Sequence, residues 1–169
     1  AEMRHGAMQA LTASEERYQM LFEHGFEGIM IGNLKTRKPE SCNEKLLEFL
    51  TMSKEEFLNK NMLEMIAFPE DKNKEQAVYH VLERAKQFEK TGEIQFKIAL
   101  KSKRKENVIA EVTAVLLPKP NEHLCIAIFK DITQQRKAQE KILSANEGLK
   151  NFAHAASHDL KEPLRMIQS

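Results

Sequence analysis

Residues 93–133 read EIQFKIALKSKRKENVIAEVTAVLLPKPNEHLCIAIFKDIT. Apolar side chains recur at every second position over residues 94–100 and again over residues 108–116. A period of two predicts β-strands that bury one face. The basic segment 101–107 and the proline-containing segment 118–122 have the composition of turns. The region therefore predicts consecutive antiparallel strands joined by two turns.

The strand expected after the second turn has a different pattern. Residues 124–129 are almost all apolar, which is typical of a central strand covered on both faces. Two shorter strand signals lie upstream, at residues 29–33 and at residues 40–42, with a turn over residues 35–39 between them. We therefore expect an α+β domain in which helices pack on one five-stranded antiparallel sheet.

Helical signals lie between the second and third strands. Residues 44–50 follow Asn43, and Ser53 with Glu56 has the spacing of a capping box at the start of a second short helix. Residues 61–66 predict a further short helix or turn.

Two longer helices are also expected in the first part of the chain. Ser14 has the position of a cap, and Tyr18, Leu21 and Phe22 would form the apolar stripe that follows it. The second long helix is predicted from Phe68 to about residue 86. Its apolar stripe consists of Ala77, Val78, Val81, Leu82 and Ala85.

Composition limits the function classes. The 169 residues suffice for one domain with an extension, and 26 basic side chains nearly balance 25 acidic ones. We therefore expect no nucleic-acid partner, and the basic run at residues 101–105 contains no aromatic side chain that would suggest one. No apolar run approaches the roughly 18–20 residues of a membrane span, and the amino terminus lacks the apolar core of a signal peptide.

Cysteine usage indicates a cytoplasmic protein. Cys42 and Cys125 have no motif spacing, so we interpret them as reduced, buried thiols. No cluster of cysteine and histidine suggests a metal site. The expected location is the cytoplasm, whether or not a longer parent protein is anchored in a membrane further upstream.

From residue 134 onward the pattern is that of one long helix. Two apolar positions repeat every seven residues, which predicts a parallel contact between two copies and hence a homodimer. The first position holds Ile142, Leu149 and Ala156, and the second holds Ala138, Ala145 and Phe152. Gly148 lies inside the predicted helix, where a glycine lowers helix stability by about 1 kcal/mol relative to alanine. We expect it to provide a flexible joint.

Residues 151–165 read NFAHAASHDLKEPLR. A histidine on a helix surface, here His158, can offer one ring nitrogen as a nucleophile, while a carboxylate such as Asp159 holds the proton of the other nitrogen. Pro163 removes a backbone donor and would bend the helix. The alternative is a surface histidine without chemistry, which is how we interpret His154.

These residues resemble the phosphoacceptor box of sensor histidine kinases. The matching positions are Phe152, Ser157, His158, Asp159, Leu160, Pro163, Leu164 and Arg165. The resemblance implies that His158 is the phosphoacceptor and takes the γ-phosphate of ATP, with Asp159 as general base or orienting acid. The phosphoryl group would then pass to the receiver domain of a response regulator.

Nucleotide-binding motifs are missing from this sequence. No glycine-rich nucleotide loop and no magnesium box follows His158. ATP and Mg²⁺ would therefore bind in a catalytic domain outside this chain. The parent protein would be a protein histidine kinase, and this chain alone should be inactive.

The middle of the chain resembles a PAS domain. The residues that carry the resemblance are Ser14-Glu15-Glu16-Arg17-Tyr18, Leu21-Phe22-Glu23, Asn43 with Leu46-Leu47, Phe68-Pro69-Glu70-Asp71 and Asp131-Ile132-Thr133. The last triplet is typical of the signal hand-over from a PAS sheet to its output helix, where Asp131 and Thr133 can cap the helix while Ile132 packs on the sheet. Asn33 and Asn107 depart from the pattern, because aspartate and glycine are common there.

The resemblance implies a pocket between the sheet and the short helices, and use as a sensor, a dimerisation module or both. It argues against haem, because Glu75 occupies the expected place of the haem histidine and His80 comes five residues later. It also argues against a flavin adduct, because residues 41–44 read Ser-Cys-Asn-Glu where the flavin family has Asn-Cys-Arg. No cofactor is identified in this chain. A core filled by its own side chains and an unknown small ligand both stay open.

The sequence thus predicts four parts. They are an N-terminal segment (1–13), a PAS sensor domain (14–133), a signalling helix (134–150) and the truncated start of a phosphoacceptor and dimerisation domain (151–169). The leading hypothesis is the sensory and phosphoacceptor fragment of a two-component sensor histidine kinase. One alternative is a PAS ligand-binding and dimerisation module without phosphotransfer, and another is a passive coiled-coil scaffold.

Overall fold

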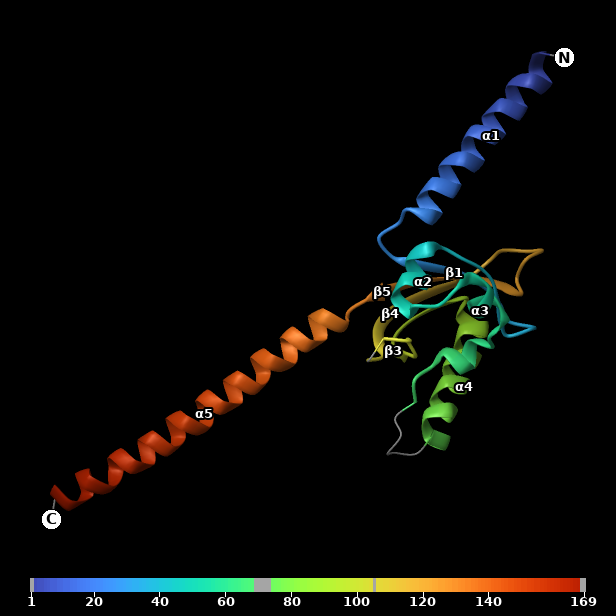
Figure 1. The fold of residues 1–169 in the computed structure, drawn as a ribbon. Coiled ribbons are helices and arrows are strands. Elements are labelled where there is room, and N and C mark those ends of the chain that lie inside the picture. Colours follow the sequence, from blue (N-terminus) through green and yellow to red (C-terminus); the bar gives the residue numbers. More distant parts are fainter. Residues whose placement is uncertain (1, 69–73, 105, 168–169) are drawn as a thin grey trace. The chain divides into compact units, whose positions relative to one another are not determined.

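Within residues 2–68, 74–104 and 106–167, which the computed structural model describes, the chain forms one antiparallel sheet of five strands (Figure 1). The strands are β1 (Gly28–Asn33), β2 (Lys38–Cys42), β3 (Glu93–Leu100), β4 (Val108–Leu116) and β5 (Leu124–Asp131). Their order across the sheet is β2-β1-β5-β4-β3. Every neighbouring pair is antiparallel. The predicted α+β fold is confirmed.

Alternation along the strands gives the sheet one buried face. The buried residues of β4 and β5 on this inner face are Val108, Ala110, Val112, Ala114, Cys125, Ala127 and Phe129. In the register of β4 and β5, Ala114 lies opposite Ala127 and Val112 lies opposite Phe129. Two alanines therefore meet between β4 and β5, and each puts only a methyl group on that face.

The outer face of the sheet corrects one prediction. Strand β5 is central, as expected, but the described residues cover only one of its faces. Ile128 is 36% exposed and Val115 on the neighbouring strand is 47% exposed. The expectation of two covered faces was wrong because isoleucines on an open sheet face look the same in sequence as isoleucines in a core.

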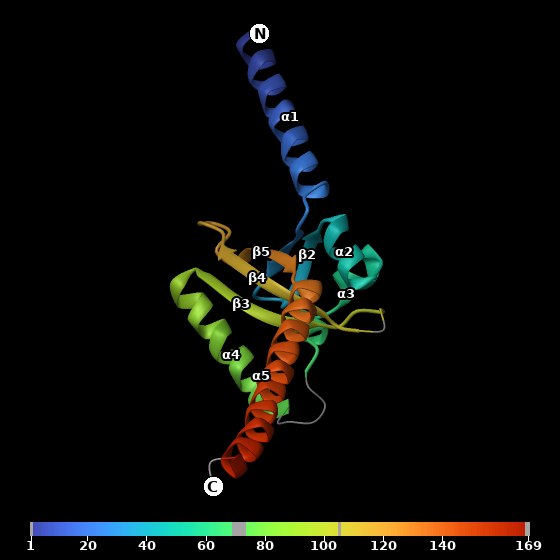
Figure 2. The ribbon, with the colours of Figure 1, turned by 90° about the vertical axis from the view of Figure 1, so that its left-hand side faces the viewer.

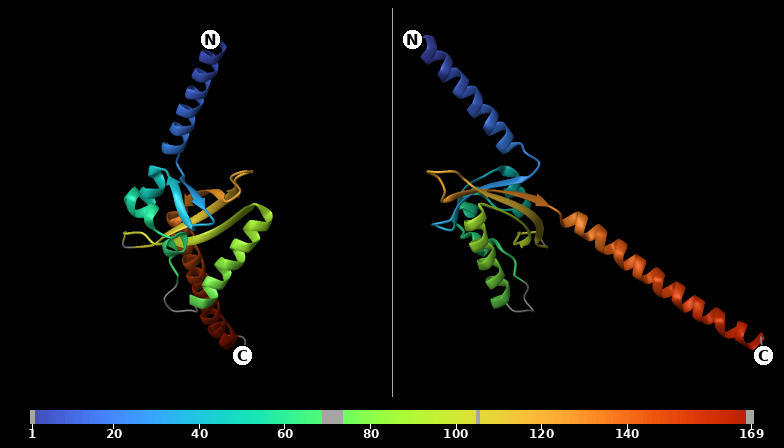
Figure 3. Two further views of the ribbon diagram at one scale, coloured as in Figure 1. Left: turned by 90° about the vertical axis from the view of Figure 1, so that its right-hand side faces the viewer. Right: turned by 180° about the vertical axis from the view of Figure 1, so that it is seen from behind.

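Helices cover the inner face. They are α2 (Glu44–Leu50), α3 (Lys54–Asn59), the 3₁₀ helix η1 (Met62–Met65) and α4 (Lys74–Thr91). Their side chains Leu46, Leu50, Phe57 and Phe88 join the inner face of the sheet in one buried core. Helix α4 lies beside β3, at the edge of the sheet opposite β2 (Figure 2; Figure 3).

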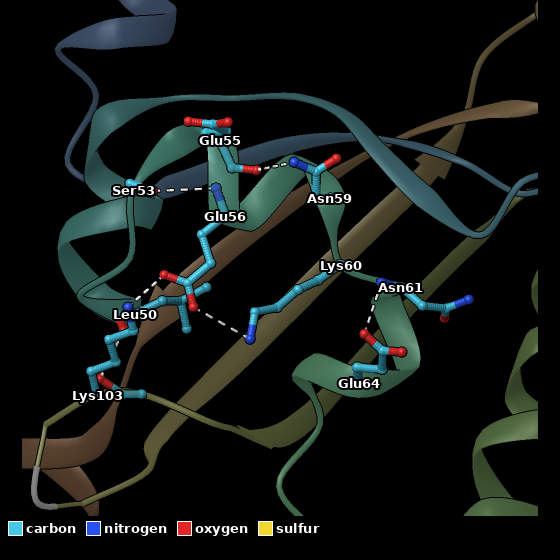
Figure 4. Close-up of polar contacts among 10 residues, drawn as sticks. Leu50, Ser53, Glu55, Glu56, Asn59, Lys60, Asn61, Glu64 and Lys103 are labelled. Carbon is cyan, nitrogen blue, oxygen red and sulfur yellow. Dashed lines mark hydrogen bonds and ion pairs between the residues drawn. The ribbon is translucent and has the colours of Figure 1, made fainter.

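Capping residues fix the starts of the short helices (Figure 4). The Ser53 side chain accepts a hydrogen bond from the Glu56 backbone N–H at 3.2 Å, as predicted. The carboxylate of Glu56 pairs with Lys103 and Lys60. The predicted capping box of Ser53 and Glu56 is therefore only half formed, because the Glu56 carboxylate is turned to these lysines. A complete capping box occurs one helix later, where the side chains of Asn61 and Glu64 bond to each other's backbone.

The first helix is longer than expected. Helix α1 runs from Glu2 to Glu23, so Ser14 lies inside the helix and does not cap it. Residues 2–13 contain no proline and are rich in alanine, methionine and leucine, which are strong helix formers. This composition extends the helix by more than three turns before the predicted start.

The apolar stripe of α4 also differs from the prediction. Residues 69–73 of the predicted helix start, and the side chains of Ala77 and Glu75, lie outside the described residues. Val81 and Ala85 face the core side, as expected, but Leu82 is 40% exposed. Phe88, which lies beyond the predicted helix end, is buried. Helix α4 continues to Thr91, and Gly92 ends it with a φ of 76°.

The chain divides into two units between Ile132 and Thr133. The second unit is α5 (Thr133–Ile167), a helix that includes Pro163. The side chains of the predicted seam are open to solvent in this single chain: Ile142 is 62% exposed, Leu149 65% and Phe152 73%. Among the described helices, none has the length and apolarity needed to cross a membrane.

Candidate functional site: an interior cavity and the His158 segment

A cavity of about 210 Å³ lies on the inner face of the sheet. The strands contribute Met30, Ile94, Phe96, Ile98, Leu100, Val112, Ala114, Cys125, Ala127 and Phe129 to its lining. The helical segments contribute Leu46, Leu50, Phe57, Met62, Leu63, Met65, Ile66, Val81, Arg84, Ala85 and Phe88. The small side chains of Ala114 and Ala127 at the centre of the sheet leave space for the cavity, which both of them line.

Sulfur-containing side chains form one wall of the cavity. A methyl group added to Gly32 would lie 3.0 Å from Met62 Sδ and 3.2 Å from Cys125 Sγ, so the absence of a side chain there lets both sulfurs approach β1. Burial raises the pKa of the Cys125 thiol. The thiol is therefore neutral near pH 7 and contributes a weakly polar surface to the cavity.

Arg84 brings a charge to this apolar cavity. The guanidinium carbon lies 5.6 Å from the centre of the Phe96 ring, and both residues line the cavity. The preceding acid on α4, Glu83, pairs with Lys86 at 3.0 Å. No acidic side chain in the described part of the chain forms an ion pair with Arg84. Aromatic contact is the interaction that orients this cation.

The turn between β3 and β4 holds the helical wall of the cavity in place. The Lys103 backbone N–H donates to the Leu50 carbonyl at 3.2 Å, and the Ser102 hydroxyl donates to the same carbonyl. Arg104 donates to the Glu48 carbonyl at 2.9 Å. These bonds satisfy carbonyls that the last turn of α2 leaves unpaired. The basic turn thus has a structural use within the domain.

The two residues that were compared with haem and flavin motifs, His80 and Cys42, lie away from the cavity. His80 is exposed on α4 and does not contribute to the lining. Cys42 is buried outside the cavity, and burial raises the pKa of its thiol to about 11. No group of three or more histidine, cysteine or acidic side chains in residues 2–68, 74–104 and 106–167 is placed to hold a metal ion.

The predicted phosphoacceptor lies on α5. The His158 side chain is 71% exposed and that of Asp159 is 81% exposed. His158 Nδ1 and Asp159 Oδ1 are 3.6 Å apart, which is an electrostatic contact and too long for a hydrogen bond. Such an exposed imidazole is accessible to a nucleotide or to another protein domain. His154, one turn earlier, is exposed as well.

The sequence profile of the PAS domain family matches residues 27–134. This chain belongs to the PAS domain family. The match covers the whole sheet, the short helices and α4, and therefore the entire cavity. Comparison with curated protein sequences gave no match.

Solved PAS domains share the fold of this chain. A PAS domain of an HTR-like protein from Haloarcula marismortui superposes with a TM-score of 0.61 at 17% identity, over 78% of this chain and 100% of that one. A domain of a sensory box sensor histidine kinase/response regulator from Geobacter sulfurreducens gives 0.56 at 18% identity, over 72% and 96%. A PAS domain in complex with ethanol, from a LuxR-family transcriptional regulator of Burkholderia thailandensis, gives 0.54 at 15% identity, over 69% and 97%.

Asn43 ties three segments of the PAS domain together. Its side chain is fully buried, and its Oδ1 accepts hydrogen bonds from the Ile29 and Leu46 backbone N–H groups. Its Nδ2 donates to the carbonyls of Phe22 and Glu27, each at 2.9 Å. The sequence identified Asn43 as a family residue and helix start, but did not reveal its bonds to Phe22 in α1 and to Glu27 before β1, because these partners lie 21 and 16 residues away.

The end of the PAS sheet leads directly into α5. Ile132 is 6% exposed, and its backbone N–H donates to the Ile109 carbonyl at 2.9 Å. Asp131 is the last residue of β5, and Thr133 is the first residue of α5. The predicted triplet therefore occupies the junction between strand and helix. Its use in signal hand-over stays a prediction.

Asn33 has a defined role despite departing from the family pattern. Its Oδ1 accepts hydrogen bonds from the backbone N–H groups of Lys35 and Thr36, and its Nδ2 donates to Glu40 at 2.6 Å. An aspartate could make the first two bonds. The amide adds the third, which an aspartate cannot donate.

Proposed function

We propose that this chain is the sensory and phosphoacceptor part of a two-component sensor histidine kinase. The observation that carries the proposal is the order of two features along the chain. The match to the PAS family ends at residue 134, and α5, which begins at Thr133, carries an exposed His158 with an adjacent carboxylate. A structural neighbour named as a sensor histidine kinase/response regulator supports this assignment at the level of fold.

The chemistry assigned to His158 is phosphoryl transfer. One ring nitrogen attacks the γ-phosphorus of ATP, an N–P bond forms, and the bond to the bridging oxygen breaks so that ADP leaves with the electron pair. Asp159 interacts with the protonated ring nitrogen and stabilises the positive charge that develops on the imidazole. ATP and Mg²⁺ are held by a catalytic domain outside this chain.

The second transfer goes to a response regulator. A carboxylate oxygen of an aspartate in its receiver domain attacks the phosphorus, the N–P bond breaks, and its electron pair returns to the imidazole. Because His158 is 71% exposed, a receiver domain can approach it without unfolding the helix. Both transfers use cytoplasmic partners, so the proposal assigns the chain to the cytoplasm.

The proposal includes a homodimer through α5. Ile142, Leu149 and Phe152 repeat with heptad spacing and are more than half exposed in the single chain. Pairing two copies would remove these side chains from water. His158 lies outside the two seam positions, so pairing leaves it accessible.

Phosphorylation in trans tests the proposal. The chain is incubated with labelled ATP, Mg²⁺ and the isolated catalytic domains of several histidine kinases, each of which labels its own acceptor helix as a positive control. We expect acid-labile label on the wild type and none on His158→Gln. His154→Gln is the matched control, because it removes a histidine one turn earlier on the same helix, and it should be labelled like the wild type. The chain with Mg-ATP alone should stay unlabelled.

The results separate two functions. Label that persists in His158→Gln, or a wild type that no active catalytic domain labels, would contradict phosphotransfer at this residue. The second candidate is a PAS ligand-binding and dimerisation module, and the observation that favours it is the apolar cavity. Under that function, ligand binding and dimerisation are unchanged in His158→Gln and no phosphorylation occurs.

A further inference from the structure

The size and lining of the cavity limit what it can bind. Apart from Arg84, the described residues that line it are aliphatic, aromatic or sulfur-containing. An apolar cavity of about 150 Å³ holds one benzene ring. The volume of about 210 Å³ here therefore suits a single ring with a short side chain, or an aliphatic chain of similar size.

The cavity borders solvent along α4. Ala85 lines the cavity and is also exposed, so the helix leaves part of the cavity uncovered. Phe96 on β3 is half-buried and lines the same side. A ligand in the cavity can therefore keep a polar end at this border while its apolar part lies on the sheet.

Arg84 determines the charge that fits at the border. Its guanidinium is close to the Phe96 ring, at 5.6 Å from the ring centre, and no described acidic side chain pairs with it. A guanidinium has a planar set of donors that matches the two oxygens of a carboxylate. A ligand carboxylate would supply the counter-charge that the described residues do not supply here.

We propose that the cavity binds a small apolar carboxylate, with the hydrocarbon part in the cavity and the carboxylate on Arg84. The inference deepens the sensory part of the proposed function by naming a ligand class. It does not depend on His158. Because Cys125, Ala127 and Phe129 of β5 line the cavity, the ligand contacts the strand that continues into α5.

Isothermal titration calorimetry with two matched probes tests whether a ligand carboxylate pairs with Arg84. Phenylacetate and 2-phenylethanol have similar hydrocarbon parts, but only the first carries a carboxylate. We expect phenylacetate to bind the wild type about tenfold more tightly than the alcohol. Arg84→Gln should reduce the affinity for phenylacetate to that for the alcohol, and should leave the affinity for the alcohol unchanged.

A control variant removes the same charge elsewhere on α4. Lys90 is exposed and does not line the cavity, so Lys90→Gln should bind phenylacetate within about twofold of the wild type. If Lys90→Gln loses as much affinity as Arg84→Gln, the effect is one of net charge and the proposed pairing is wrong. Equal binding of acid and alcohol by the wild type would also overturn it.

Methyl NMR identifies where the probe binds. Phenylacetate should shift the methyl signals of Ala114 and Ala127, which line the cavity, and leave the signal of Ala10 on α1 unchanged. No binding of either probe at 5 mM, or shifts confined to residues outside the lining, would overturn the inference. His158→Gln should bind phenylacetate like the wild type, so a failure of ligand binding is distinguishable from a failure of phosphotransfer.

Discussion

Asn43 is the residue whose buried polar groups constrain the domain most. One side chain satisfies two backbone donors, in β1 and α2, and two backbone carbonyls, one at the end of α1 and one just before β1. Water cannot replace these bonds readily, because Asn43 is fully buried. A single asparagine thereby couples the N-terminal helix to the helical wall of the cavity.

Replacing Asn43 with alanine should destabilise the domain strongly. An unsatisfied buried polar group costs about 1–3 kcal/mol, and several groups lose their partner at once, so we expect a loss of about 3–4 kcal/mol. Urea unfolding followed by circular dichroism measures this. Asn33→Ala is the matched control, because the bonds of Asn33 are exposed, and it should lose under about 1 kcal/mol. Equal losses in the two variants would contradict this account of Asn43.

Sequence reasoning succeeded for residues whose role is local and failed for those whose partners are distant. Ser53 was correctly predicted to cap α3, because its partner is the Glu56 backbone three positions later. The side chain of Glu56 pairs with Lys103, 47 residues away, and no local pattern indicates that pair. Arg84 was missed for the same reason, because a cavity forms only when α4 meets the sheet.

At the level of elements, the turn between β3 and β4 connects the sheet to α2 and α3 through the bonds of Ser102, Lys103 and Arg104. Lys103 pairs with Glu56 at 2.5 Å, and the side-chain hydrogen bond from Lys103 is the main cause that lowers the pKa of Glu56 (Figure 4). Lys60 contributes to the same shift. A carboxyl group with a lowered folded-state pKa stabilises the fold above its unfolded-state pKa.

The stability that the ion pairs of Glu56 contribute should therefore depend on pH. The stabilisation by Glu56 is present above its ordinary value of 4.5, and is lost as the pH falls through the lowered pKa of the folded state. Glu56→Gln should be less stable than the wild type at pH 7, and the difference should shrink as the pH falls below about 4. Thermal unfolding from pH 7 to pH 3 measures this. Glu55→Gln is the control, because Glu55 is exposed on the same helix. A difference that stays constant with pH would count against the ion pair.

The strands were easier to predict than the helices. Period-two alternation identified β3 and β4 because each buries one face of a regular sheet. The phase of α4 was predicted from Val78, Val81 and Leu82, whereas the structure buries Phe88 and exposes Leu82. A helix that borders an open cavity buries only a narrow stripe, and a narrow stripe gives a weak periodic signal.

For the whole molecule, the fold could be predicted from the sequence more directly than the function could. The PAS domain could be predicted because its alternating strands and family residues occur in a fixed order. The resemblance of the His158 segment to a phosphoacceptor box could be recognised because all its matching residues lie within one short stretch, and its role stays a prediction. The ligand class proposed above could not be inferred from the sequence, because it rests on the contact between Arg84 and Phe96 beside the cavity.

The unbroken course of α5 from Thr133 to His158 has a mechanical consequence. At 1.5 Å per residue, the histidine lies about 38 Å along the helix from Thr133, and each residue turns the helix by about 100°. If α5 turns as a rigid helix, a rotation at Thr133 reaches His158 as a rotation of the same angle. We therefore predict that residues added to α5 change the angle at which the histidine is presented.

Insertions into residues 134–150 test this. Seven added residues restore the heptad phase, so we expect phosphorylation in trans to be retained. Four added residues rotate His158 by one full turn plus about 40°. They also shift the seam positions after the insertion by about half a heptad, so we expect dimerisation and labelling to fall together. Labelling is measured as above and dimerisation by sedimentation. Equal labelling of both insertions would mean that α5 is a tether, and that only the distance to the sheet matters.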